Sequence, residues 1–402
     1  MDCVRVLRSG QDRTGKPRED TVHHDTYTII IIALALYLVN KDIVTKIFFV
    51  FCATYTISAK QARKGCGVGG KGRVRLSFWA LDFCLPFCYN RGRRYLIDHP
   101  RALAQKECFM KRITKAVIPA AGLGTRMLPI SAGVPKEMLP IVDLPAVYYL
   151  VEEAVKSGIT DILIVTNRDK EAMENFFDYS PEYEARLLAT GKTELAARLR
   201  AVADMANVSF IRQKEALGLG HAVARARSFV GDEHFVVLYG DDIIFSEVPV
   251  CRQLMDAYEK YGLGAVGVKP VPIEDVRRYC SLKVEPHAGE DGLYHCTDMI
   301  EKPKPGEEFS NLSILGRVLL PPSIFDILAD LPRGAGGEYQ LTDAMAILSR
   351  SEGVTAVDFE GTRYDLGSKL GFLKANVVRG VCHGEVGAEF AAFLKDFVKT
   401  LD

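Results

Sequence analysis

The sequence predicts an α/β fold built on a doubly wound, mostly parallel mixed sheet. From about residue 115 onward, short apolar runs typical of buried strands alternate with longer segments typical of amphipathic helices. A loop with two glycines follows the first run, and in sheets of this kind ligands bind beyond the carboxyl ends of the strands. With 48% hydrophobic and 25% charged residues, the composition is that of a globular protein. The formal net charge is zero, so no overall basic field points to a nucleic-acid partner.

The expected elements follow one another in regular order along the chain. Buried parallel strands are expected over residues 115–121, 161–166, 208–213, 234–242 and 264–269. Helices are expected between them over residues 145–158, 168–178, 219–230 and 249–262. Such an alternation implies right-handed crossovers between neighbouring strands. A further strand-like run covers residues 354–361, and a helix is expected near the C-terminus over residues 385–401.

The first 109 residues differ in composition from the remainder. They hold six of the ten cysteines and the single tryptophan, whereas the four later cysteines are widely spread and show no zinc-like spacing. Uncharged or nearly uncharged runs at 26–40 and 43–57 are separated by Lys41 and Asp42, and each is short for a membrane span. Two interpretations remain: a membrane-associated segment, or a reading frame that extends upstream of a true start at Met110. We favour the second. The chain is therefore divided into an extension (1–109) and one domain (110–402), with reduced thiols in a cytoplasmic setting.

The loop after the first strand carries the first candidate site. Gly122 and Gly124 allow a ligand to approach the backbone, and Arg126 and Lys136 follow. Neither the G-x-G-x-x-G pattern nor Walker A is present, because Met127 occupies the third glycine position and no Gly-Lys-Ser/Thr closes the loop. Two cations beside such a loop suit a polyphosphate, although a purely structural turn is an alternative explanation.

Three other stretches carry chemically suggestive residues. Gln213 precedes Gly218, and its amide has the donor and the acceptor needed to pair with a pyrimidine edge. Asp241 and Asp242 end an apolar run, where carboxylates commonly hold a divalent metal. Neighbours on a strand face opposite sides, so one of the two is expected to be a ligand, with Asp365 as a possible partner.

Each of these stretches also has a simpler explanation, as a turn or a helix cap. Glu301 and Lys302 would suit sugar hydroxyls and a phosphate, but such pairs are common on solvated loops. His221 is expected to be only a helix-start residue. The sequence contains no H-E-x-x-H or G-x-S-x-G motif, which disfavours hydrolases.

In combination and in this order, the motifs resemble the bacterial UTP–glucose-1-phosphate uridylyltransferases (UDP-glucose pyrophosphorylases), a family of sugar nucleotidyltransferases. The matching stretches are "PAAGLGTRMLP", "PKEMLPIVD", "QKEALGLGHAV", "GDDI", "IEKP", "GEYQLTDA" and "YDLGS". They cover nearly all of residues 110–402 and none of the first 109. The resemblance implies a Rossmann-like nucleotidyltransferase fold with a smaller sugar-binding and C-terminal helical part.

The resemblance also implies roles for individual residues. The nucleotide would be bound by Ala120, Ala121, Gly122, Gly124, Gln213 and Gly218, the last two reading the base. Arg126 and Lys136 would hold the triphosphate, and Asp241 with Asp365 would bind Mg²⁺. Lys302 would bind the sugar phosphate and Glu301 the glucose hydroxyls. One departure concerns Cys280, which follows Tyr279 where the family usually has glycine; its side chain is expected to crowd the sugar.

The implied reaction is attack by the glucose 1-phosphate oxygen on the α-phosphorus of UTP, which releases pyrophosphate. The nucleophile is already an anion at neutral pH, so no general base is required. The partners would be UTP and glucose 1-phosphate, in a cytoplasmic homo-oligomer (dimer or tetramer) without nucleic acid or membrane. Alternatives are thymidylyl or other nucleotidyl transfer to a related sugar 1-phosphate, and a non-catalytic nucleotide-sugar binding protein.

Overall fold

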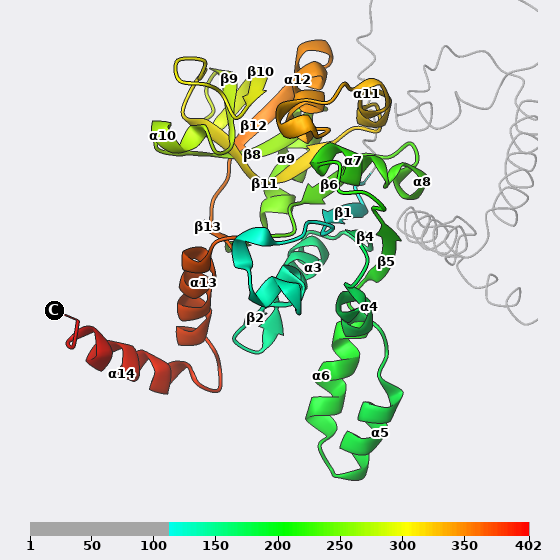
Figure 1. The fold of residues 1–402 in the computed structure, drawn as a ribbon, viewed down its shortest axis with the longest axis vertical. Helices are drawn as coiled ribbons and strands as arrows, with labels where there is room; N and C mark the ends of the chain where they lie inside the picture. Colours follow the sequence, from blue (N-terminus) through cyan, green and yellow to red (C-terminus); the bar gives the residue numbers. More distant parts are fainter. Residues whose placement is uncertain (1–111, 402) are drawn as a thin grey trace, which may run out of the picture. The chain divides into compact units, whose positions relative to one another are not determined.

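A nine-stranded mixed sheet with helices on both faces forms the centre of the described part of the chain (Figure 1). The computed structural model describes residues 112–401. The strand order is β5-β4-β1-β6-β11-β8-β12-β10-β9, and two small sheets pair β13 with β7 and β2 with β3. The predicted fold class is therefore confirmed.

The strands of the large sheet are β1 (Lys115–Pro119), β4 (Asp161–Thr166), β5 (Asn207–Arg212), β6 (Phe235–Leu238), β8 (Gly264–Pro270), β9 (Cys280–Pro286), β10 (Leu293–Glu301), β11 (Leu312–Leu320) and β12 (Val354–Asp358). The small sheets are formed by β2 (Pro140–Ile141), β3 (Leu144–Pro145), β7 (Asp242–Phe245) and β13 (Thr362–Asp365). The helices are α3 (Ala146–Lys156), α4 (Glu171–Phe177), α5 (Pro181–Ala189), α6 (Thr193–Ala203), α7 (Leu219–Ala224), α8 (Arg227–Val230), α9 (Val250–Tyr261), α10 (Ile273–Val276), α11 (Ile324–Asp330), α12 (Leu341–Ser351), α13 (Lys369–Val381) and α14 (Gly387–Val398).

Alternate residues of the central strands enter two separate cores. In β1, Ala116 and Ile118 pack with residues of α3 and α9, whereas Val117 packs on the opposite face with residues of α7, α11 and α12. Both faces of the sheet are thus covered, which explains why the strands read as continuous apolar runs.

The order of the strands places a ligand crevice beside β1. The chain runs from β1 to β4 and β5 on one side and then returns to β6 on the other side, with all these neighbouring pairs parallel. This reversal is a topological switch point, and it lies at the carboxyl end of β1, where the glycine loop begins.

The structure corrects several expectations about single elements. Residues 207–212 form β5 at the edge of the sheet, and none of them is fully buried, contrary to the expected buried strand. The helix expected over residues 219–230 divides into α7 and α8, because the Ala226 amide bonds back to the carbonyl of Val223 and tightens the turn. The antiparallel strands β9, β10 and β11 are found in addition to the parallel ones.

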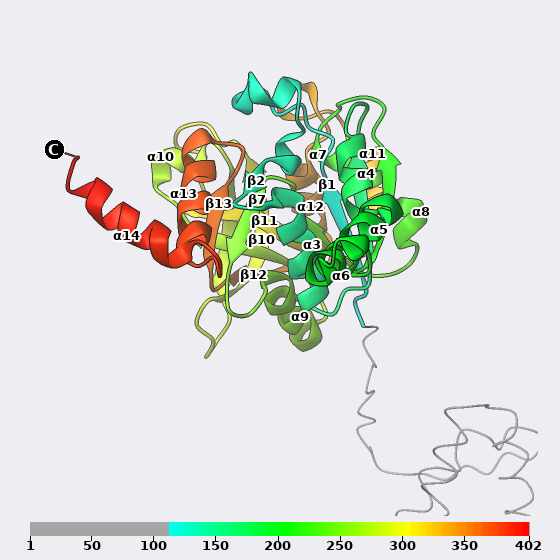
Figure 2. The same cartoon turned by 90° about the horizontal axis from the view of Figure 1, so that it is seen from below.

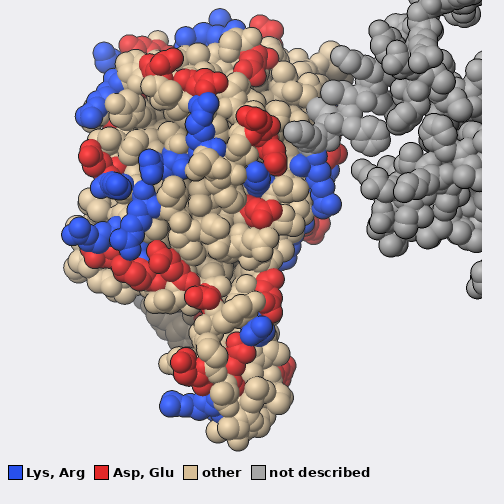
Figure 3. Space-filling view, turned by 90° about the vertical axis from the view of Figure 1, so that its right-hand side faces the viewer, with Lys and Arg blue, Asp and Glu red and all other residues tan. Residues whose placement is uncertain are grey.

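The expectations for the first 109 residues lie outside the described residues. None of the helices within residues 112–401 combines the length and apolar character needed to cross a bilayer. The face drawn in Figure 3 carries basic and acidic side chains in mixed groups rather than one extended basic tract.

Candidate active site

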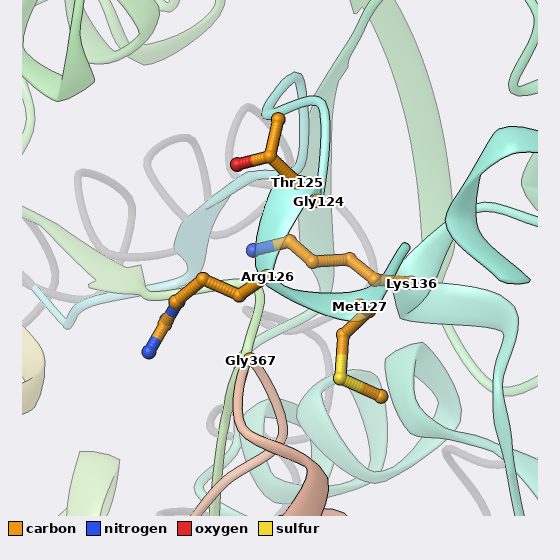
Figure 4. A pocket seen from close by; sticks show the side chains of 6 residues that line it. All are labelled: Gly124, Thr125, Arg126, Met127, Lys136 and Gly367. Atoms are coloured by element: carbon orange, nitrogen blue, oxygen red, sulfur yellow. The ribbon is translucent and has the colours of Figure 1, made fainter. Parts of the chain in front are cut away.

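The glycine loop leaves β1 and brings two basic side chains together. Gly124 has a φ of 67°, which favours glycine, and the chain then forms a short 3₁₀ turn over Thr125–Met127. A second such turn, Lys136–Met138, runs beside it. Figure 4 shows Arg126 and Lys136 extending from these turns in the same direction, beside a pocket of about 180 Å³ that Gly367 also lines.

Two carboxylates pair with the two cations of this loop. Lys136 Nζ lies 2.7 Å from Asp241 Oδ2, and Arg126 Nη1 lies 2.9 Å from Asp365 Oδ2. Arg126 Nη2 also reaches Asp241 Oδ2 at 3.4 Å, so one guanidinium joins both carboxylates. The sequence predicted Asp241 and Asp365 as partners, and the structure brings them together although 124 positions separate them. The resulting cluster of two cations and two anions has no net charge.

Electrostatics favour the charged forms of Lys136 and Asp241 at neutral pH. Burial lowers the pKa of Lys136, but the charges of Asp241 and Glu137 and the hydrogen bond to Asp241 together outweigh it, and the pKa is raised. Burial likewise raises the pKa of Asp241, yet Lys136 and Arg126 bring it below its ordinary value. The site thus holds stable charges before any ligand arrives.

Asp242 belongs to a different network from its neighbour Asp241. It is buried and pairs with Arg363, whose Nη2 lies 2.6 Å from Oδ1. Burial and the Asp241 charge raise the pKa of Asp242 to about 6, while Arg363 opposes the shift. Gly316 of β11 packs against Asp242 with a φ of 86°, and a Cβ there would lie 2.7 Å from that of Asp242. The expectation that only one of the two aspartates faces the site therefore agrees with the geometry.

A buried ion pair that the sequence analysis missed holds the glycine loop in place. Lys170 Nζ donates to the carbonyl oxygens of Ala120 (2.6 Å) and Gly122 (2.8 Å) and to Glu137 Oε2 (2.8 Å). The side chains of Lys170 and Glu137 are only 7% and 0% exposed. Burial lowers the pKa of Lys170 and raises that of Glu137, and their mutual attraction opposes both shifts. Lys170 lies in the charged stretch "RDKE", which reads as solvated, and nothing in the motif "PKEMLP" shows that Glu137 pairs with it.

A cavity of about 410 Å³ opens between the glycine loop and the loop after β5. Its lining includes five of the residues predicted to bind nucleotide, namely Ala121, Gly122, Gly124, Gln213 and Gly218, together with Lys136 and Asp241. The sixth, Ala120, is buried behind this wall, and its carbonyl is taken by Lys170. The structure thus places most of the predicted base and phosphate residues around one space, while Arg126 lines the smaller pocket, which shares Gly124 and Lys136 with it.

Beside this cavity, the Gln213 amide contacts a residue to which the sequence analysis gave no role. Gln213 Nε2 donates to the carbonyl of Gly218 (3.1 Å) and lies 2.9 Å from Nδ1 of His221. The expectation that His221 only starts a helix is therefore incomplete. The only local signal at His221 was its place in the first turn of a helix, directly after a glycine. That signal does not reveal a contact with Gln213, eight positions away.

The predicted sugar side carries the adjacent residues Glu301 and Lys302. Glu301 ends β10, and the Lys302 ammonium, whose side chain is 51% exposed, lies 3.7 Å from the Glu301 carboxylate. The Lys302 amide donates to the carbonyl of Tyr279, and its φ is 46°. Burial raises the pKa of Glu301 above its ordinary value.

The expected contact of Cys280 with the sugar is corrected by the structure. Cys280 is 3% exposed and packs in the core among residues of β8, β9 and β11. Its Sγ accepts the amide hydrogen of Ile314 at 3.3 Å, so the thiol faces the interior rather than a ligand. The geometry therefore contradicts the expectation that the Cys280 side chain crowds the sugar.

The chain is similar in sequence to a known protein family and to proteins of known name. Residues 115–378 match the family model described as nucleotidyl transferase. The UTP–glucose-1-phosphate uridylyltransferase YngB of Bacillus subtilis is 50% identical over 289 residues, covering 72% of this chain and 97% of the relative. The enzyme of the same name from Staphylococcus epidermidis is 48% identical over 286 residues, covering 71% and 99%.

Solved structures give the same result. A UTP-bound UGPase from Acinetobacter baumannii superimposes with a TM-score of 0.66 at 38% identity, covering 72% of this chain and all of that one. A UDP-glucose pyrophosphorylase complexed with UDP-glucose gives a TM-score of 0.61 at 38% identity, covering 67% and 98%. Taken with the glycine loop and its paired charges, these matches show that the chain belongs to the nucleotidyl transferase family, in the group of UTP–glucose-1-phosphate uridylyltransferases.

Proposed function

We propose that the chain transfers the uridylyl group of UTP to α-D-glucose 1-phosphate, giving UDP-glucose and pyrophosphate. The observation that carries this proposal is the cluster of Arg126, Lys136, Asp241 and Asp365 beside the 410 Å³ cavity lined by Gln213 and Gly218. A polyphosphate needs cations and a base needs a selective pocket, and both lie within one crevice. The names of the relatives support the choice of substrates.

The chemistry asks the protein mainly to bring two anions together. Two unit charges 4 Å apart repel by about 4 kcal/mol at an effective dielectric near 20. Arg126 and Lys136 would offset this repulsion at the triphosphate, and Lys302 would do so at the sugar phosphate. Alignment of the bound reactants would supply roughly 7–11 kcal/mol more. The sugar phosphate oxygen is already ionised, so no side chain has to remove a proton.

Nucleotidyl transferases generally use a divalent metal, and we propose Mg²⁺ here. The residues fit such an ion: Asp241 and Asp365 share one guanidinium, and both offer the hard oxygen ligands that Mg²⁺ prefers. Within residues 112–401 no group of three or more His, Cys, Asp or Glu side chains could hold a metal. Substrate phosphates and water would therefore complete the shell. The ion would neutralise phosphate charge. With Asp241 and Asp365 holding the ion, Arg126 and Lys136 would be free to face the phosphates.

The test is pyrophosphate release by the full chain with Mg²⁺. Each of UTP, dTTP, ATP and GTP is paired with glucose, galactose and N-acetylglucosamine 1-phosphates. We expect strong turnover only for UTP with glucose 1-phosphate, and loss of that turnover when EDTA is added, with recovery on excess Mg²⁺. Preference for dTTP would favour thymidylyl transfer, and UTP binding without turnover in any pairing would favour a non-catalytic binding protein.

We also propose that residues 110–402 carry the whole activity. Support comes from the family match, which begins at residue 115, and from alignments that include nearly all of each relative. A chain that begins at Met110 should match the full chain in kcat and KM within about twofold. A loss of turnover in the shorter, folded chain would show that the first 109 residues contribute.

We also propose that the protein is a homo-oligomer in the cytoplasm. Helices α13 and α14 stand away from the sheet (Figures 1 and 2) and expose apolar side chains such as Leu373 (59%), Phe393 (58%) and Phe397 (46%). Phe393 and Phe397 stack with ring centroids 5.7 Å apart. Such a surface suits a second copy of the chain. Light scattering after size exclusion should give a dimer or tetramer, and a monomer at micromolar concentration would contradict this.

The four described cysteines are free, which fits a reducing compartment.

A further inference from the structure

The Gln213 amide nitrogen is held from two sides at the wall of the nucleotide cavity. Gln213 directly follows β5, is 6% exposed, and lines the cavity with Gly218. Its Nε2 donates to the Gly218 carbonyl at 3.1 Å and lies 2.9 Å from His221 Nδ1. Both contacts are within ordinary hydrogen-bond length.

The chemistry of the three groups fixes their proton positions. A carbonyl oxygen only accepts, so the nitrogen end of the amide must face Gly218. An amide nitrogen only donates, so Nδ1 of His221 must be the acceptor of the second hydrogen. His221 is therefore neutral, with its proton on Nε2. A flipped amide would set its oxygen against the Gly218 carbonyl and lose that hydrogen bond whichever tautomer His221 adopts, so the Gly218 contact fixes the orientation.

The position of the His221 ring is itself determined by the surrounding loop. The Gly220 amide donates to the Tyr339 carbonyl at 2.8 Å, which anchors the first turn of α7. The Tyr339 ring lies beside the imidazole, with centroids 6.3 Å apart and an interplanar angle of 36°. The imidazole is thus presented to Gln213 by contacts that do not involve a ligand.

With both amide hydrogens engaged, only Oε1 of Gln213 is available to a bound base, and it can only accept. Uracil carries an N–H at ring position 3, whereas cytosine has a bare, accepting nitrogen there. We infer that His221 is a positioning residue that makes Gln213 an obligate acceptor and thereby favours UTP over CTP. This inference rests on the proposed function, in which Gln213 faces the base.

Three variants test this inference through the ratio of kcat/KM for UTP to that for CTP, with glucose 1-phosphate as the second substrate. His221→Phe keeps a ring but removes the acceptor; we expect a higher KM for UTP, little change in kcat, and a ratio about 10-fold lower, the effect of one lost hydrogen bond. His221→Asn places an amide oxygen near the position of Nδ1 and should retain the ratio. His295→Phe, on β10 and outside the cavity lining, is the matched control and should also retain it.

The outcomes separate the inference from the function on which it rests. A wild-type ratio in folded His221→Phe, or an equal loss in His221→Asn, would overturn the role of His221 while leaving uridylyl transfer intact. A wild-type enzyme that uses UTP and CTP equally would also overturn the inference alone, whereas the absence of turnover with UTP would overturn both. A measurement on the unmodified protein is independent of folding in the variants: ¹⁵N spectra of the histidines, assigned by the signal lost in His221→Asn, should show Nδ1 unprotonated. A proton on Nδ1 would overturn the inference.

Discussion

The phosphate side and the sugar side of the site are built in different ways. On the predicted phosphate side the ion pairs are closed to hydrogen-bonding distance, from Lys136 with Asp241 at 2.7 Å to Lys170 with Glu137 at 2.8 Å beneath the glycine loop. On the predicted sugar side the pair of Lys302 with Glu301 is looser, at 3.7 Å. The first set of contacts is thus formed by the fold itself, whereas we expect the second to be completed by substrate. Substitutions in the first should therefore affect both stability and activity, and those in the second activity alone.

The largest effect should follow from removing Lys170. Lys170→Met leaves the Glu137 carboxylate buried without its cation and releases the carbonyls of Ala120 and Gly122. Breaking a buried pair from one side costs roughly 3–5 kcal/mol, so the free energy of unfolding should fall by about that amount in urea titrations. Arg198→Met is the control, because its pair with Asp143 is exposed and should contribute less than about 1 kcal/mol. Equal losses in both variants would contradict the proposed difference between the regions.

Lys302→Ala should give a large loss of activity without a loss of stability. By analogy with other groups that stabilise transition-state charge, kcat should fall roughly 10²–10³-fold, while the melting temperature stays that of the wild type. Lys304→Ala on the same loop is the matched control and should leave turnover unchanged. Near-wild-type turnover in folded Lys302→Ala would remove this residue from the site, and a large drop in melting temperature would show that the sugar side is also structural.

The smallest of these effects is expected at the base. Gln213→Ala should reduce the preference for UTP over ATP and GTP by about 10-fold, since it removes one hydrogen-bonding group from the cavity wall. The ratio of kcat/KM values for the nucleotides is the measurement, with melting temperature as the check on folding. Unchanged selectivity would mean that another group reads the base.

The part of the fold that could be predicted is the part with local signals. The strands β1 and β4 are continuous apolar runs next to amphipathic segments, and they were found at nearly their true bounds. The strand expected over residues 234–242 is too long, because β6 ends at Leu238 and Asp242 begins β7. Strand β11 was missed because Gly316 and Arg317 interrupt its apolar pattern. The structure explains both: the glycine lets β11 approach Asp242, and the buried Arg317 pairs with Glu153 of α3 at 2.6 Å.

For the candidate site, too, only residues with a local sequence signal could be predicted. Residues that carry motif chemistry, such as Arg126, Asp241 and Gln213, could be proposed from the sequence as candidates, and the structure places them at the two pockets beside the glycine loop. Lys170 and His221 could not, because their roles lie in contacts with residues 33 and 8 positions away, respectively, that depend on the folded path of the chain. Cys280 was misplaced for a related reason: a departure from a motif shows that something differs but not which way the side chain points.

The paired charges of the phosphate side also bear on how fast nucleotide is captured. Arg126, Lys136, Asp241 and Asp365 together behave as a zwitterion, and the whole chain has no formal net charge. Such a site projects little field beyond a Debye length of about 8 Å at physiological salt. Nucleotide should therefore arrive by diffusion without long-range steering, and its association rate should depend only weakly on ionic strength. In the proposed function, attraction would begin only on contact, when phosphate oxygens would replace the aspartates as partners of Arg126 and Lys136.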